Sequence, residues 1–372
     1  MPKTIWVKRN DAFASKYLKT TELLDTRLYT LELMDLIGTT AELLMLADKV
    51  SFRVYGENVV AAQLIKVFGI RGFESLLEQG AIEFVLWRPT VTYYDNDAFR
   101  GKGILPLQAG ALSSPAHCDP AESARLGLNW FPGLLSDAER SSLSKKISDR
   151  TILPSDKLSH RVVGLVHEMY KQHVLDVFGL DGKTLEDLPI EDRRKLCGLA
   201  SDTLEAEVAA THGYDFLNDE RPWMVCQAIV VSEPRESALR DAFNRIAEIE
   251  RVPSLKNAFL KNTLSFSALP DLRTRESSVR LREWLWNVTQ TGRAEDITKV
   301  YLDALQKPEG FFETTGFKLM KIAIGSAVGA AVTGGPGIAV GAGLAMFDEF
   351  GLKKLAQGWT PRNFIDSTLR NT

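Results

Sequence analysis

Residues 322 to 347 read IAIGSAVGAAVTGGPGIAVGAGLAMF, a run of 26 residues without a charged side chain. Charged residues make up 25% of the whole chain, so this run differs sharply from its surroundings. Near its middle lies Gly334-Gly335-Pro336-Gly337, which cannot continue a helix because proline lacks an N–H and glycine favours turn conformations. We therefore expect two short helices that fold back on each other as an αα-hairpin within residues 314–358.

Each half of this hairpin carries two glycines spaced four apart, Gly325 with Gly329 and Gly337 with Gly341. Residues four apart share a helix face, so the two helix backbones can approach each other closely. Each half is shorter than the about 20 residues that a membrane-spanning helix needs. Three interpretations stay open: a buried hairpin in a helical core, a constitutive membrane span, and a shielded hairpin that enters a membrane after a trigger. The third resembles the hydrophobic hairpins of some soluble pore-forming toxins.

The first part of the chain has a different character, with strands interleaved between helices. The stretch Lys49 to Tyr55, KVSFRVY, alternates as a strand does, residues 57–68 have helical spacing, and residues 82–87 and 90–94 again favour strands. This pattern predicts a mixed α/β domain over residues 1–115. Beyond Ser113-Ser114-Pro115 we expect a larger, mainly helical domain over residues 116–372, with a subdomain break near residue 221. The predicted fold class is α+β.

Composition narrows the compartment and the partners. The 372 residues carry a net charge of -3, which gives no general attraction to DNA. Three widely separated cysteines argue for a reducing compartment and against a disulfide framework. No apolar segment of signal-peptide type follows the first ten residues. We expect a cytoplasmic protein, which would be peripheral to the inner face of the membrane if the hairpin acts there.

Arg161 and His167 lie on one predicted helix with five residues between them. A histidine can transfer a proton near neutral pH, and an arginine can stabilise phosphoryl charge. Their spacing resembles the R-x4-6-H signature of HEPN-type ribonucleases over seven residues. The resemblance implies that Arg161 and His167 act on the RNA 2′-hydroxyl and the scissile phosphate, in a dimer and without a metal.

Residues 251–293 hold eight Lys or Arg and three acidic residues. Within them, Arg275, Arg282 and Trp286 predict either a solvated helix face over a tryptophan-anchored core or a basic-aromatic surface for anionic lipid. The position of this segment shortly before the apolar run favours lipid if the surface is functional.

Other candidate motifs do not have the residue spacing that metal or phosphate binding requires. His160, His167 and His173 do not match a metal-binding pattern, and Gly182-Lys183-Thr184 lacks the first glycine of a phosphate-binding loop. We therefore predict no metal and no cofactor.

Two functions follow. The first is a non-enzymatic interaction protein with a protein partner, whose sharper form is an effector that acts on an anionic membrane through residues 322–347. The alternative is the metal-independent ribonuclease, with RNA as its substrate.

Overall fold

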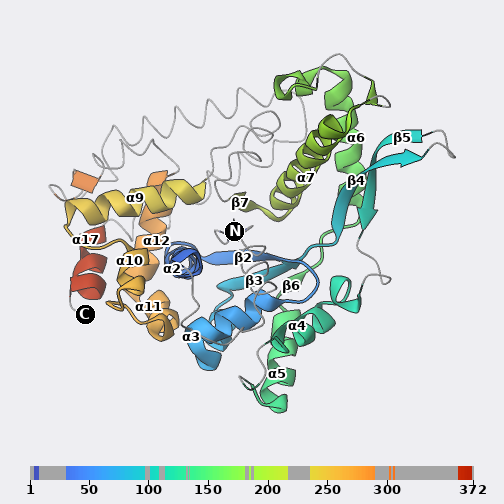
Figure 1. Cartoon of the computed structure of the whole chain (residues 1–372). Coiled ribbons are helices and arrows are strands. Elements are labelled where there is room, and N and C mark those ends of the chain that lie inside the picture. Colours follow the sequence, from blue (N-terminus) through green and yellow to red (C-terminus); the bar gives the residue numbers. More distant parts are fainter. Residues whose placement is uncertain are drawn as a thin grey trace, which may run out of the picture. The chain divides into compact units, whose positions relative to one another are not determined.

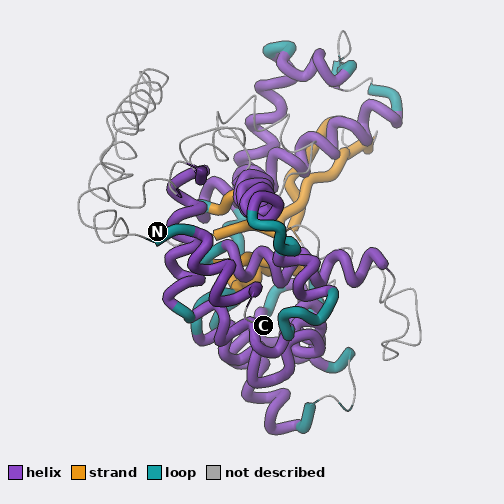
Figure 2. Tube along the Cα trace, turned by 90° about the vertical axis from the view of Figure 1, so that its left-hand side faces the viewer, coloured by secondary structure: helices purple, strands orange, loops and turns teal. Residues whose placement is uncertain are grey.

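The structure is a computed structural model, and it describes residues 4–7, 31–96, 101–108, 114–130, 133, 135–180, 184–185, 188–216, 235–289, 301–302, 305 and 359–370. Most of these residues are helical, and strands form a smaller share (Figure 2). The chain divides into two compact units. The first holds Met1–Ile37 and Ala47–Glu236, and the second holds Gly38–Leu46 and Ser237–Thr372.

A five-stranded sheet, in which every neighbouring pair is parallel, lies at the centre of the first unit (Figure 1). Its order is β6-β3-β2-β1-β7, and its strands are β1 (Thr4–Val7), β2 (Lys49–Val54), β3 (Ile82–Leu86), β6 (Thr151–Ile152) and β7 (Tyr214–Phe216). The chain builds outward from β1 through β2 and β3 to β6, and then returns to place β7 on the other side of β1. The carboxyl ends of all five strands therefore lie along one edge of the sheet.

Strand β2 gives the sheet two unlike faces. Its residues point alternately to opposite sides, as successive residues of a strand do. The positions on one face are the buried apolar residues Val50, Phe52 and Val54, and those on the other are Lys49, Ser51 and Arg53. On the apolar face the rings of Phe52 and Phe84 lie 6.1 Å apart between centroids. The polar face is unusual, because Ser51 and Arg53 are also buried.

Three helices and one 3-10 turn lie below the sheet in the view of Figure 1: α3 (Val59–Glu78), η3 (Pro115–His117), α4 (Pro120–Leu128) and α5 (Asp137–Ser148). The Asn58 side chain caps α3 by accepting a hydrogen bond from the Ala61 N–H at 3.0 Å. Ser136 and Glu139 form a reciprocal capping box at the start of α5. Gly69, with φ +75°, interrupts α3 with a kink that a residue with a side chain would adopt only under strain.

An antiparallel ribbon and two long helices complete the first unit. The ribbon pairs β4 (Pro89–Asn96) with β5 (Gly101–Gln108), and the helices are α6 (Lys157–Lys171) and α7 (Ile190–His212), with the 3-10 helix η4 (Val174–Phe178) between them. Ribbon and helices share one apolar core, which includes Val91, Ile104, Val162, Val166, Leu196, Leu204 and Val208. Gly213 ends α7 in the left-handed conformation, so β7 begins directly afterwards.

The regular elements described in the second unit are all helical, with turns and short loops between them. Its elements are α9 (Arg235–Ile249), α10 (Leu255–Leu260), η6 (Phe266–Ala268), α11 (Leu269–Thr274), α12 (Glu276–Thr289), α17 (Pro361–Phe364) and the π-helical turn η8 (Ile365–Arg370), together with residues 38–46 of α2 (Leu31–Leu46). Phe243 of α9 and Phe364 of α17 meet edge to face at 6.1 Å between ring centroids. The described residues nearest the C-terminus thus pack into a helical core.

The mixture of helices with a few strands in small sheets confirms the α+β class. Strands β6 and β7 come after residue 115 and pair with β3 and β1 of the same sheet. The two compact units change over after Glu236. The predicted domain boundary near residue 115 stays a prediction, and residue 221, near the predicted subdomain break, lies outside the described residues.

The predicted hairpin over residues 314–358 also lies outside the described residues. Among the helices that the structure does describe, none has both the length and the apolar character needed to cross a bilayer.

Candidate functional site

The polar face of the sheet carries a half-buried carboxylate that accepts three hydrogen bonds. Glu83 of β3 accepts from Lys49 Nζ at 2.8 Å and from Ser51 Oγ at 3.2 Å. The hydroxyl of Tyr214, on β7, also donates to Glu83. Burial, together with this hydrogen bond, raises the pKa of Tyr214, so its hydroxyl stays a donor over the physiological range. The His212 ring stacks on Tyr214 at 5.4 Å, and burial lowers the pKa of His212.

Further along the same face, Arg53 of β2 pairs with Glu205 of α7. The Arg53 Nη1 atom lies 3.0 Å from Glu205 Oε1, and the two residues are only 5% and 1% exposed. Removing two charges from water costs several kcal/mol for each ion, so a buried pair is weak evidence of stabilisation by itself. The presence of this buried ion pair is therefore not explained by stability alone.

Two aromatic rings lie against the Arg53 guanidinium. Its central carbon lies 4.8 Å from the centroid of Tyr55 and 5.1 Å from that of Trp87, within the range of cation–π attraction. The rings of Tyr55 and Trp87 meet edge to face at 6.5 Å. The backbone N–H of Trp87 donates to the Val54 carbonyl at 2.7 Å. This bond holds the Trp87 backbone beside β2 at the point where β3 ends. Trp87 is 6% exposed, whereas Tyr55 is 46% exposed and reaches solvent.

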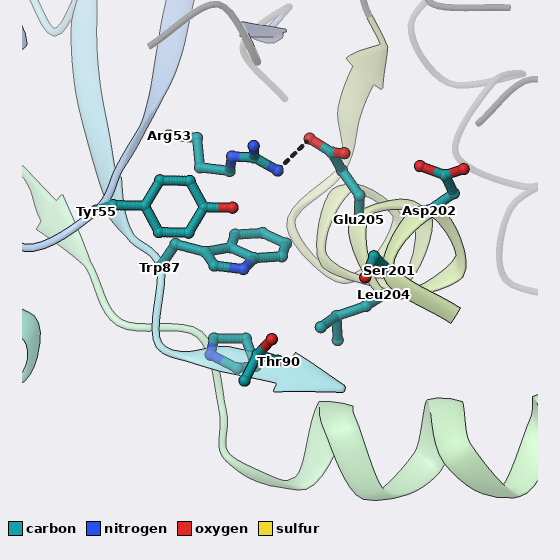
Figure 3. Close-up of a pocket in the computed structure, with 9 residues that line it drawn as sticks. Arg53, Tyr55, Trp87, Thr90, Ser201, Asp202, Leu204 and Glu205 are labelled. Carbon is teal, nitrogen blue, oxygen red and sulfur yellow. Dashed lines mark hydrogen bonds and ion pairs between the residues drawn. The ribbon is translucent and has the colours of Figure 1, made fainter. Parts of the chain in front are cut away.

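These residues line a pocket with a volume of about 180 Å³. Its walls come from the ends of β2 and β3, the start of β4 and the middle of α7, and consist of Arg53, Tyr55, Trp87, Pro89, Thr90, Ser201, Asp202, Leu204 and Glu205. Figure 3 shows Glu205 pointing from α7 towards Arg53, with Tyr55 and Trp87 lying side by side against the arginine. The pocket lies at the carboxyl edge of a parallel sheet, which is where open α/β sheets bind ligands.

The lining offers carboxylates, hydroxyls, one guanidinium and two aromatic rings. None of the pocket's lining residues is a histidine or a cysteine. The Ser201 hydroxyl donates to the Cys197 carbonyl at 2.8 Å, so it is not directed at a base. No group of histidine, cysteine and acidic residues within the described ranges is arranged to hold a metal ion.

The structure places Arg161 and His167 against different neighbours. Arg161 is exposed on α6, and its guanidinium pairs with Glu207 of α7 and lies 3.5 Å from the Thr211 hydroxyl. His167 is half-buried on the same helix, beside Gly103 of β5. Helix α6, which carries both residues, ends at Lys171, and His173 takes a left-handed conformation with φ +60° before η4 begins. The ribonuclease role of the pair stays a prediction.

The predicted basic-aromatic surface is divided by burial. Arg275 is exposed at the end of α11, and Trp286 is half-buried on α12. Arg282 is 8% exposed, and its Nη1 atom donates to the Arg273 carbonyl at 3.2 Å, so this guanidinium lies inside the helical core. The small residues predicted to close the hairpin lie outside the described residues: Gly325, Gly329, Pro336, Gly337 and Gly341.

Sequence reasoning missed the pocket, although part of its signal was visible. The alternation of KVSFRVY places Arg53 and Tyr55 on the polar face of a strand. Nothing near Glu205 indicates that it faces Arg53, because 152 positions separate the two residues. Scans of protein-family models, and searches of characterised proteins and of solved structures, found no match to this chain. The site therefore has to be interpreted from its own geometry.

Proposed function

We propose that this chain is a non-enzymatic interaction protein whose first unit recognises one small chemical group in the pocket between the sheet and α7. The observation that carries the proposal is the buried Arg53–Glu205 pair, with Tyr55 and Trp87 against the arginine, beside a cavity at the carboxyl edge of the sheet. A buried pair costs desolvation energy, and the best-attested use of such a pair is to fix one registry or to act as a switch. The cavity next to this pair is the place where a bound group could bias such a switch.

The ribonuclease alternative has less support from the described contacts. Arg161 would have to stabilise developing phosphoryl charge, yet its guanidinium pairs with the Glu207 carboxylate. A substrate phosphate would compete with that carboxylate for the same donors. We therefore prefer the interaction role.

The membrane step belongs to the same proposal and comes from the sequence. Ligand binding in the first unit is the trigger, and residues 322–347 are the segment that acts on an anionic membrane. The substitution Gly329→Leu would widen the contact between the two halves and reduce ligand-dependent dye release from anionic liposomes. Circular dichroism of the same variant separates this effect from loss of folding.

Binding in the pocket is tested by a thermal-shift screen of small cations, anions and neutral molecules on the full chain. Ser201→Tyr is the blocking variant, because Ser201 is exposed on α7 and lines the pocket. Ala210→Tyr is the matched control: Ala210 is also exposed on α7, and nine positions along a helix bring it to the opposite face.

We expect at least one compound to raise the melting temperature of the wild type and of Ala210→Tyr, but not that of Ser201→Tyr. A screen with no compound that behaves in this way would overturn the proposal.

A further inference from the structure

We infer that the pocket and the outer face of the β4–β5 ribbon together bind an extended segment of a protein partner, which places one uncharged apolar side chain in the pocket. This inference rests on the proposed binding function and names the kind of partner. Three properties of the first unit support it: the balance of charge beside the cavity, the size of the cavity, and the exposed apolar residues that continue from its rim.

The charges beside the cavity are balanced. Glu205 neutralises Arg53 through the contact at 3.0 Å between Oε1 and Nη1, and both side chains are buried. The carboxylate of Asp202, which also belongs to the lining, is directed away from Arg53 and from both aromatic rings (Figure 3). A charged group that enters the pocket would lose its water beside an ion pair that is already complete, which is costly. An uncharged group avoids that cost.

The cavity has the size and the walls for one apolar side chain. Its volume is about 180 Å³, and its lining includes the apolar residues Trp87, Pro89 and Leu204. An apolar cavity of roughly 150 Å³ accommodates a benzene molecule. The pocket therefore has room for one phenylalanine ring or one leucine side chain. Trp87 and Leu204 are 6% and 1% exposed, whereas Tyr55 is 46% exposed and reaches solvent.

Exposed apolar residues continue from the rim of the pocket along the outer face of the ribbon. Thr90 lines the pocket and lies directly opposite Leu107 in the β4–β5 register. Directly opposite residues share one face of an antiparallel pair, and the next pair on that face is Thr92 with Leu105. The two leucines are 47% and 41% exposed. We call Thr90, Thr92, Leu105 and Leu107 the ribbon face.

The ribbon face fits an extended peptide. None of its four residues is charged, in a chain of which 25% of the residues are charged. Contiguous exposed apolar residues that adjoin a pocket are typical of interaction sites. Leu105 and Leu107 lie two residues apart on one strand, or about 6.6 Å, and an extended segment repeats its side chains on one face at the same interval. Such a segment can fill the pocket with one residue and cover a leucine with the next residue on that face.

The composition of the ribbon face also favours a protein over a membrane. Attraction to an anionic lipid surface depends on clustered Lys and Arg side chains, and the four residues of the ribbon face include neither. We therefore assign this face to a protein partner.

The test is isothermal titration of the full chain with the blocked peptides acetyl-Leu-Thr-X-Thr-Leu-amide, in which X is phenylalanine, alanine, lysine or glutamate. The order of side chains in this peptide is the same from either end, so the design requires no knowledge of the strand direction. We expect the phenylalanine peptide to bind at least tenfold more tightly than the other three. Alanine leaves the cavity unfilled, and a charged side chain has to be desolvated.

Two variants locate the binding. Ser201→Tyr fills the pocket and Leu107→Glu places a charge on the ribbon face, and each should weaken binding of the phenylalanine peptide at least tenfold. Ile190→Glu is the matched control, because Ile190 is also an exposed apolar residue of the first unit, at 63%. Eleven positions along α7, or about 16 Å, separate it from Ser201. This control should leave the affinity unchanged.

Four outcomes would each overturn the inference: tightest binding of the lysine or glutamate peptide, equal affinity for all four, binding that Ser201→Tyr and Leu107→Glu leave unchanged, or no binding. If a charged peptide binds most tightly and Ser201→Tyr blocks it, the proposed binding function stands while the uncharged side chain is excluded. If no peptide binds and sedimentation velocity shows a dimer that Leu107→Glu makes monomeric, a second copy of the chain covers the ribbon face, and the partner segment is excluded.

Discussion

Glu205 in the first unit and Glu250 in the second are both buried carboxylates that pair with arginine, but their partners differ. Arg53, the partner of Glu205, has a side chain only 7% exposed. Glu250 accepts hydrogen bonds from Arg362 Nε, Arg370 Nη2 and the Tyr301 hydroxyl at 2.9, 2.9 and 2.6 Å. The side chains of Arg362 and Arg370 are 50% and 41% exposed.

The comparison shows that a buried ion pair does not mark a functional site by itself. Around Glu250, the arginines come from α17 and η8 and fasten the last described helical residues to the end of α9. They can turn to solvent if the carboxylate is lost. Arg53 is buried against two aromatic rings beside a cavity and cannot be rehydrated so easily. The first arrangement serves packing, and the second is suited to selecting a ligand.

The largest effect should come from breaking the Arg53–Glu205 pair on one side only. Glu205→Leu leaves a buried guanidinium without its carboxylate, which costs about 3–5 kcal/mol of unfolding free energy. The double variant Arg53→Met with Glu205→Leu removes both charges and should recover most of that loss, because hydrophobic replacements of a buried pair are often neutral. Urea unfolding of the two variants measures both values.

If the double variant is as unstable as Glu205→Leu alone, the ion pair itself stabilises the packing of α7 on the sheet, and apolar side chains cannot replace it. If the double variant instead folds normally but binds no ligand, stability and recognition are separated at this pair.

The sequence predicts some of the elements around these two ion pairs and not others. The alternation from Lys49 to Tyr55 indicates the strand and puts Arg53 on its polar face. By contrast, β6 has two residues and β7 has three, too few to show a strand period, so the sheet's continuation past residue 115 could not be foreseen. Thr360 followed by Pro361 is a local helix-start pattern, and Thr360 is the N-cap residue of α17. Which acid faces which arginine depends on tertiary contacts that no local pattern records.

Glu250→Gln should have a smaller effect, about 2 kcal/mol, because it weakens charge-assisted hydrogen bonds while its arginines remain partly hydrated. The loss should also depend on pH. Burial alone would raise the pKa of Glu250, but the hydrogen bonds from Tyr301, Arg362 and Arg370 outweigh it and lower that pKa. The folded state therefore holds the proton less tightly than the unfolded state, whose pKa is about 4.3.

The stability from Glu250 is accordingly present above the unfolded pKa and is lost as the pH falls through the lower folded pKa. Urea midpoints measured from neutral to acidic pH should converge for the wild type and Glu250→Gln. A constant gap between the two across that range would show that the charge of Glu250 contributes nothing.

The smallest effects should come from removing one tyrosine hydroxyl in each unit. Tyr214 donates to Glu83 in the first unit, and Tyr301 donates to Glu250 in the second. Tyr214→Phe and Tyr301→Phe should each cost about 1 kcal/mol, because each carboxylate keeps its other donors. Urea unfolding of both variants gives the two losses of unfolding free energy. Their comparison tests whether loss of a hydroxyl costs the same on the polar face of the sheet and in the helical core.

At alkaline pH, the titration of these two hydroxyls differs from that of ordinary surface tyrosines. Burial, followed by the hydrogen bond to the neighbouring carboxylate, raises the pKa of both Tyr214 and Tyr301. The folded state holds these protons more tightly than the unfolded state, so their stabilisation is complete below the unfolded pKa of about 10 and is lost as the pH rises through the higher folded pKa. In an ultraviolet titration of tyrosinate, neither substitution should reduce the absorbance that develops around that ordinary pKa. A reduction with Tyr214→Phe would mean that water reaches the Tyr214 hydroxyl on the polar face of the sheet.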